Sequence, residues 1–198
     1  MKYAIIGDIH SSVEDLLAVL RHIQEVEPNA EKISTGDLFE CIIGKKRAQK
    51  EVFDAIEDVL IEPEKIMPLL TFPTVYGNQE ERIVAICKVD HPIIHFVSML
   101  PQKLYIQGAS VTHGHEWDWS GEPWTPQITE NEEKLFFFGH SHTSSLFLNG
   151  VRSAFQFDEI IHLSSAHTGV NVGSVVTNRE WVLYDSEERT IEFKKTAD

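Results

Sequence analysis

The sequence predicts an α/β fold, with two packed sheets and helices outside them, in one domain spanning residues 1–198. In the first half, apolar runs ending in glycine alternate with segments whose apolar residues recur three and four positions apart. The second half consists mostly of strand-like runs and hairpin turns. A length of 198 residues, with 42% hydrophobic and 24% charged residues, suits one globular domain.

Three helical segments are predicted in the first half. Ser11 and Glu14 match a capping box, and the segment after them places Leu16, Leu20 and Ile23 on one apolar face. Pro28 ends this pattern. The other two helices are expected over residues 48–61 and residues 80–99, the latter with an interruption at Pro92.

Strands are predicted from short apolar runs bounded by turn residues. Gln107-Gly108 and Asn149-Gly150 are expected to join neighbouring strands, and Asn-Gly is a strong hairpin signal. The predicted strand segments are residues 2–7, 32–37 and 69–78 in the first half, and 103–114, 134–142, 145–153 and 180–193 in the second.

Five predicted strands end in a glycine beside acidic, amide or imidazole side chains. The carboxyl ends of strands are where α/β sheets gather ligand pockets, and glycine lets the backbone approach a ligand closely. The five blocks are "IIGDIH" with Asp8 and His10, "STGDLF" with Asp37, "VYGNQE" with Asn78, "VTHGH" with His113 and His115, and "FFGHSH" with His140 and His142.

These side chains are candidate metal ligands. Carboxylate, imidazole and amide groups without a thiolate suit Mn, Fe, Zn or similar divalent ions. Seven such groups are too many for one ion, but they suit two ions that share one carboxylate, with waters completing the shells. The candidates are Asp8, His10, Asp37, Asn78, His113, His140 and His142.

The ordered set D-x-H, G-D, G-N-x-[ED], H-G-H and G-H-x-H resembles the calcineurin-like metallophosphoesterases, over roughly Met1 to Val175. The resemblance implies their four-layer α/β/β/α sandwich, with two mixed sheets flanked by helices. The short chain looks like the small bacterial and archaeal phosphodiesterase branch. "GNQEERI" and "LPQKLYI…VTHG" also resemble the dinucleoside-tetraphosphatase and serine/threonine phosphatase branch. "VNVGSV" resembles an Asn-Pro-Gly-Ser motif, with Val172 in the place of proline.

The resemblance also implies a binuclear centre and a hydrolytic function. Mn²⁺ is the first choice of metal, with Fe, Zn or Ni as alternatives, and a hydroxide bridging the ions would attack phosphorus in line. The expected reaction is hydrolysis of phosphodiesters or nucleotide-like esters. The alternatives are a phosphomonoesterase, a dinucleoside polyphosphate hydrolase, or a catalytically weak interaction scaffold. One ion would take Asp8, His10, Asp37 and His142, and the other Asp37, Asn78, His113 and His140.

One position departs from the family pattern. Many members have a histidine after the motif asparagine, whereas this chain has Gln79, a candidate substrate-binding residue. An amide donates hydrogen bonds but is not an acid at neutral pH, so we expect esters with good leaving groups to react fastest. His115 is the candidate catalytic residue that would compensate, as a proton donor or phosphate contact. The alternative is a loop histidine that only supports the site.

Charge and composition limit the partners and the location. A net charge of −14 argues against a broad nucleic-acid-binding surface, although a local cationic site could still bind a small phosphoester. Two separated cysteines, Cys41 and Cys87, fit a reducing compartment. The apolar run before Gly7 is too short for a signal peptide or a membrane span. We therefore expect a cytoplasmic protein without membrane association.

Two further segments each have two interpretations. Trp117, Trp119 and Trp124 could form a stacking platform for a nucleobase, or they could pack a loop onto the sandwich. The run "GKKRAQK", residues 44–50, is the only basic cluster. It is either a solvated helix start or a surface that steers an anionic substrate.

Overall fold

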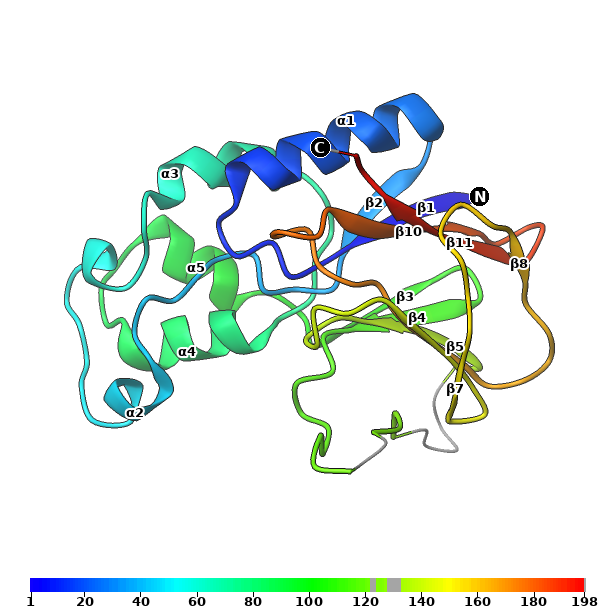
Figure 1. Ribbon diagram of the computed structural model, residues 1–198. Coiled ribbons are helices and arrows are strands. Elements are labelled where there is room, and N and C mark those ends of the chain that lie inside the picture. Colours follow the sequence, from blue (N-terminus) through cyan, green and yellow to red (C-terminus); the bar gives the residue numbers. More distant parts are fainter. Residues whose placement is uncertain (122–123, 128–132, 198) are drawn as a thin grey trace.

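The computed structural model describes residues 1–121, 124–127 and 133–197, and its strands form two sheets (Figure 1). The first sheet has the order β2 (Glu31–Ser34), β1 (Lys2–Ile6), β10 (Glu180–Asp185), β11 (Thr190–Lys195) and β8 (Ile161–His162). The second has the order β3 (Lys103–Ile106), β4 (Ala109–Thr112), β5 (Leu135–Phe138), β9 (Thr168–Asn171), β6 (Ser145–Leu148) and β7 (Val151–Ser153).

Both sheets are mixed. In the first, β1 is parallel to β2 and antiparallel to β10. In the second, β4, β5 and β9 are parallel, whereas β3, β6 and β7 pair antiparallel with their neighbours. The predicted α/β fold with two mixed sheets and helices is therefore confirmed.

The helices gather over the first sheet and at one end of the two sheets (Figure 1). The longest helix, α1, lies over the first sheet in this view. The others follow the second strand in the chain. The α-helices are α1 (Val13–Val26), α2 (Lys45–Ala48), α3 (Pro63–Ile66), α4 (Asn78–Ile86) and α5 (Pro92–Ser98), and the 3-10 turns are η1 (Ile56–Asp58) and η2 (Met67–Leu69).

Alternation along the strands builds the layers of the core. In β1, Tyr3 and Ile5 contribute to a core cluster shared with the second sheet, whereas Ala4 and Ile6 join the cluster formed with the helices. A strand buried on both faces needs an almost continuous apolar sequence, which explains the run from Tyr3 to Ile6.

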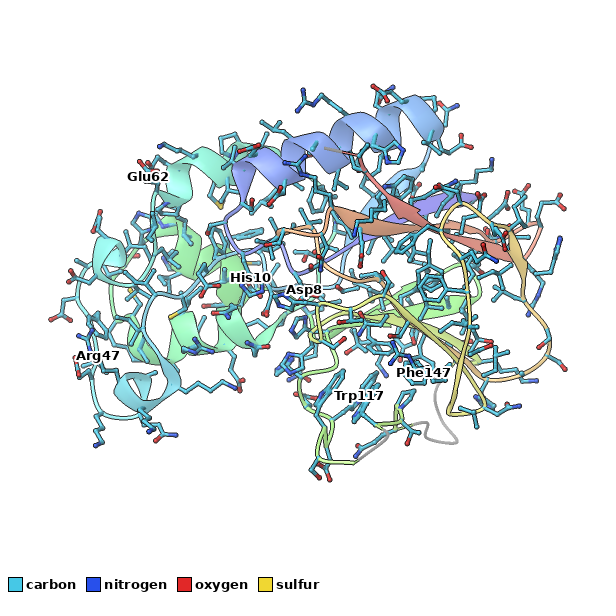
Figure 2. All side chains as sticks on the ribbon, in the orientation of Figure 1. Asp8, His10, Arg47, Glu62, Trp117 and Phe147 are labelled. Carbon is cyan, nitrogen blue, oxygen red and sulfur yellow. The ribbon has the colours of Figure 1, made fainter. Side chains whose placement is uncertain are left out.

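Side chains of β5 in the second sheet alternate between two core clusters in the same way. Leu135 and Phe137 face the core between the sheets, while Phe136 and Phe138 lie in an aromatic cluster on the other side. That cluster also includes Phe147 and, packed against it, Trp117, Trp119 and Trp124. Figure 2 shows Trp117 and Phe147 on this outer side of the second sheet.

The three tryptophans pack onto the sheet with their faces against other rings. Trp119 and Trp124 stack with centroids 3.8 Å apart and planes within 5°. Their indole N–H groups donate to the carbonyls of Gly114 and Asp118 at 3.0 and 2.9 Å. The packing interpretation accounts for these contacts, and the nucleobase platform stays a hypothesis.

The helix predicted over residues 48–61 is wrong. Only α2 and the short turn η1 are helical there, because backbone groups pair with other parts of the chain. The N–H of Phe53 donates to Ile86, and the N–H of Lys88 donates to Phe53, both at 2.8 Å. Tertiary pairing thus overrides the apolar periodicity of this segment.

Other parts of the chain also differ from the sequence-based expectation. Within residues 69–78 the strand pairing is limited to an isolated bridge at Thr74, since Pro73 has no N–H to donate. The N-cap of α1 is Ser12 and not Ser11, whose φ is 58°. The strands β8 and β9 were not predicted, and β9 contains Gly169, where a Cβ would lie 2.7 Å from the Phe136 ring.

The remaining elements agree with expectation. The segment 80–99 forms α4 and α5, and α5 begins at Pro92. The four strands on either side of Gln107-Gly108 and Asn149-Gly150 form the predicted antiparallel pairs. No helix in the described part of the chain combines the length and apolar character that crossing a bilayer requires.

The packing of β5 generates a stability prediction. Phe137 is fully buried between the sheets, so Phe137→Ala should lower the free energy of unfolding by about 3–5 kcal/mol, measured by denaturant titration. Tyr105→Ala, which removes a ring that is 70% exposed, should change it by less than about 0.5 kcal/mol. Equal effects of the two substitutions would contradict this description of the core.

Candidate metal centre

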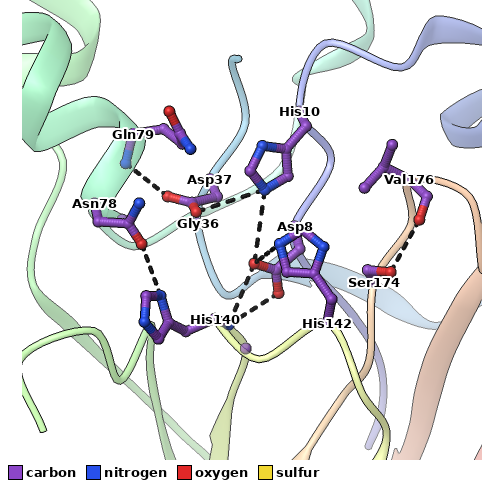
Figure 3. A network of polar contacts seen from close by, with 12 residues as sticks. Asp8, His10, Gly36, Asp37, Asn78, Gln79, His140, His142, Ser174 and Val176 are labelled. Atoms are coloured by element: carbon purple, nitrogen blue, oxygen red, sulfur yellow. Dashed lines mark hydrogen bonds and ion pairs between the residues drawn. The ribbon is translucent and has the colours of Figure 1, made fainter. Parts of the chain in front are cut away.

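The predicted ligand side chains meet where strand ends from both sheets approach the start of α4. Asp8 and His10 follow β1, and Asp37 follows β2, both in the first sheet. His113 follows β4, and His140 and His142 follow β5, all in the second sheet. Asn78 is the first residue of α4. Figure 3 shows Asp8, His10, Asp37, Asn78, His140 and His142 turned toward one another.

The cluster contains two groups that could each hold a metal ion. The first is Asp8, His10 and His142, and the second is Asp37, His113 and His140; within each group the ligand atoms lie within 4.8 Å of one another. Asn78 belongs with the second group, because its Oδ1 lies 2.7 Å from His140 Nδ1 and 3.1 Å from His113 Nε2. Two metal sites are therefore consistent with a binuclear centre.

Asp37 lies between the two groups. Its Oδ2 is 3.6 Å from His10 Nε2 and 3.3 Å from His113 Nε2, so one oxygen faces a histidine of each group. Its Oδ1 accepts a hydrogen bond from the backbone N–H of Gln79 at 2.8 Å (Figure 3). The carboxylate is thus held in the position that a shared ligand would need.

The donor atoms of the second group fit a cation. His113 Nδ1 lies 2.8 Å from the carbonyl of Thr35, which fixes the ring proton there and leaves Nε2 with a lone pair. The Asn78 oxygen, His113 Nε2 and His140 Nδ1 then face one another. A bound cation would satisfy all three, whereas without one a reversed Asn78 amide would donate to His140 Nδ1.

The first group also contains an unsatisfied atom that suits a cation. His10 Nε2 is buried and has no hydrogen-bond partner among the residues that the structure describes. The other ring nitrogen, Nδ1, lies 2.5 Å from Glu40 Oε2. A carboxylate on the far nitrogen of a metal-binding histidine is a common arrangement, because it fixes the ring and increases its basicity.

The electrostatics of the cluster favour positive charge. Burial opposes protonation of His10, but the nearby carboxylates of Asp8, Glu40 and Asp37 outweigh burial and raise its pKa to about 10. Burial likewise opposes protonation of His113, whose pKa the nearby Asp37 raises to about 9. Without cations the carboxylates draw protons onto these histidines, and metal binding would displace those protons.

His140 titrates differently. Burial, followed by the charge of His113, lowers its pKa to about 4. His140 is therefore neutral at neutral pH, which leaves a ring lone pair available to a metal.

Most of the candidate ligand residues also have an unusual backbone conformation. Five of the seven candidates have positive φ, in the left-handed region that non-glycine residues rarely adopt. Such conformations cluster at functional sites, where the surrounding structure holds them in place at a cost of about 1–3 kcal/mol each. The five are Asp8 (50°), His10 (48°), Asp37 (53°), His140 (69°) and His142 (58°).

Glu80 holds the loops that carry Asp37 and Asn78. It is fully buried, and its carboxylate accepts the N–H groups of Gly77, Asp37, Leu38 and Phe39 at 2.8–3.3 Å. A Cβ on Gly77 would lie 2.3 Å from Asp37 Oδ1, so glycine is required for this close approach. Burial, followed by the Asp37 charge, raises the pKa of Glu80 to about 7.

Sequence patterns did not indicate some residues that shape the site. Glu40 contacts His10 but lies outside the glycine-bounded blocks, so no spacing points to it. Asn171 Nδ2 donates to the carbonyl of Gly139 and to Ser141 Oγ, which supports the loop bearing both histidines after β5. In the sequence, the only indication of a role for Asn171 is its place in the "VNVGSV" motif.

The two remaining predicted site residues lie beside the cluster. His115 lines a cavity with Asn78 and His140, and its buried Nδ1 has no partner among the described residues. Gln79 is buried, and its Oε1 accepts from the N–H of Cys41 at 3.2 Å. The catalytic role of His115 and the substrate contact of Gln79 stay predictions.

The contact between Glu40 and His10 generates a binding prediction. Glu40→Ala should weaken Mn²⁺ binding by about 10–100-fold, measured by calorimetric titration, because His10 loses the group that orients it. Glu51→Ala removes a carboxylate that pairs with the exposed Arg47, and it should leave the affinity unchanged. Unchanged Mn²⁺ affinity in the Glu40 variant would contradict the orienting role.

Comparison with known proteins agrees with this geometry. The family model of the calcineurin-like phosphoesterase superfamily domain matches residues 1–183. No curated protein sequence matches the chain. A metallophosphoesterase structure from Sphaerobacter thermophilus, 17% identical, covers 100% of this chain and 89% of its own, with a TM-score of 0.66, which shows a shared fold.

Two other solved structures are similar at lower scores. An archaeal phosphodiesterase is 13% identical, with 98% of this chain and 99% of that chain covered and a TM-score of 0.47. A predicted phosphoesterase from Streptococcus pneumoniae is 14% identical, with 98% and 97% covered and a TM-score of 0.45. Because the family model spans nearly the whole chain, this protein belongs to the calcineurin-like phosphoesterase superfamily.

Proposed function

We propose that this protein is a binuclear metal-dependent phosphoesterase whose substrates are phosphodiesters or nucleotide-like esters. The position of Asp37 carries the proposal, since one carboxylate oxygen faces a histidine from each of the two groups. A shared carboxylate is what holds two cations close enough to act on one phosphoryl group.

The grouping of side chains supports a specific ligand assignment. Asp8, His10, Asp37 and His142 would hold one ion, and Asp37, Asn78, His113 and His140 would hold the other. Oxygen and imidazole donors suit Mn²⁺, which is our first choice, and also Fe, Zn or Ni. When bound, the two ions supply an activated water nucleophile and the positive charge that stabilises the transition state.

The remaining residues would position the substrate and move the proton. His115 lies in the same cavity as Asn78 and His140, so it is placed to contact a phosphoryl oxygen or to protonate the leaving group. The oxygen of Gln79 is occupied by Cys41, so Gln79 would bind substrate through its amide nitrogen.

We also propose that residues 1–198 act as one domain in the cytoplasm. Each metal group takes ligands from both halves of the chain, so neither half forms the centre alone. Cys41 and Cys87 are buried free thiols, which suits a reducing compartment.

The proposed function predicts metal-dependent hydrolysis of bis(p-nitrophenyl) phosphate. With Mn²⁺ added, Asp37→Asn should reduce the rate by at least about 100-fold, because losing a group that merely orients a metal ligand already costs about 10–100-fold. Asp90→Asn removes the same charge from a side chain that is 95% exposed, and it should leave the rate unchanged.

The same assay with p-nitrophenyl phosphate separates the candidate activities. A rate higher for the diester supports a phosphodiesterase, and a rate higher for the monoester supports a phosphomonoesterase. Absence of metal-dependent turnover on any phosphoester would contradict the enzymatic proposal and favour an interaction scaffold.

A further inference from the structure

A cavity of about 550 Å³ adjoins the candidate metal centre. Asn78 and His140 line it from the ligand cluster, and His115 lies beside them. Lys45 of α2 and Arg82 of α4 line it as well. Cavities of this size hold small organic ligands, so a substrate bound at the metals would extend into this space.

Among the described residues, neither cation in this cavity forms an ion pair with a carboxylate. Arg82 Nη1 donates to the carbonyl of Ile43 at 3.4 Å, and the described residues provide neither Arg82 nor Lys45 with an ion pair. Arg47, which lies on α2 with Lys45, instead pairs with Glu51 at 2.7 Å. In a chain with a net charge of −14, Lys45 and Arg82 therefore offer positive charge to an anion at this place.

One carboxylate, that of Glu81, also lines the cavity. Glu81 Oε2 lies 3.7 Å from His115 Nε2, and the Glu81 side chain is 63% exposed. Solvent therefore screens its charge more effectively than that of a buried group.

We propose that Lys45 and Arg82 bind a second phosphate group of the substrate. This group is attached to the alcohol whose phosphodiester is cleaved. Arginine binds phosphate through two parallel N–H groups and lysine through a compact charge, so the pair suits a phosphate dianion. The inference rests on the proposed function and narrows its substrate class to phosphodiesters with a neighbouring phosphate.

A matched pair of esters tests this inference. Thymidine 5′-(p-nitrophenyl phosphate) with and without a 3′-phosphate undergoes the same reaction, so the two differ only in the second anion. With Mn²⁺ present, kcat/KM should be about tenfold higher for the 3′-phosphorylated ester. Lys45→Ala and Arg82→Gln should each remove most of this preference through KM, and should change the other ester by less than about twofold.

Lys46→Ala is the matched control, because Lys46 is an exposed neighbour on α2 that does not line the cavity. It should leave the preference intact. Binding of thymidine 3′,5′-bisphosphate, measured by calorimetry on the Mn²⁺-loaded protein, should weaken about tenfold in the Lys45 variant and remain unchanged in the Lys46 variant.

Each other outcome contradicts the inference in a distinct way. Equal losses in the Lys45 and Lys46 variants would indicate general electrostatic steering by the basic run. Equal rates on the two esters, with both hydrolysed, would overturn the phosphate subsite but leave the proposed function standing. Hydrolysis of neither ester would contradict the proposed function together with the subsite.

Discussion

The buried carboxylate of Glu80 is the contact on which the geometry of the candidate centre depends. It accepts backbone N–H groups from the loop after β2 and from the residue before α4, which fixes two separate segments against each other. Asp37 and Asn78 are carried by those segments. Because Glu80 occupies the third position of α4, the start of this helix and the Asp37 carboxylate are positioned by one side chain.

Part of the cost of this geometry falls on the candidate ligand residues. Five of them hold left-handed backbone conformations, and carboxylates converge at the meeting point of the two sheets. Such a cluster is unstable in isolation, because like charges repel and several lone pairs face one another. Divalent cations would offset the repulsion and satisfy the lone pairs. The sheets supply the rigidity, with β1 and β5 buried on both faces.

Much of this arrangement follows from the sequence. Glycine followed by acidic or imidazole residues at the ends of apolar runs predicts which side chains gather, because strand ends meet at a common edge. The contact of Glu40 with His10 could not be predicted, since it depends on how two loops cross. Residues 48–61 have helical periodicity, yet their backbone pairs elsewhere. The central strand β9 was missed because Thr168 and Gly169 give it little apolar character, and the ring of Phe136 requires that glycine.

The central claim is that Asp37 joins two metal sites into one centre. Electron paramagnetic resonance of the protein loaded with two equivalents of Mn²⁺ tests this claim most directly. Two ions roughly 3.5–4 Å apart and bridged by a carboxylate should give the broad spectrum of an exchange-coupled pair. The six-line spectrum of isolated Mn²⁺ ions at full occupancy would contradict the shared role of Asp37.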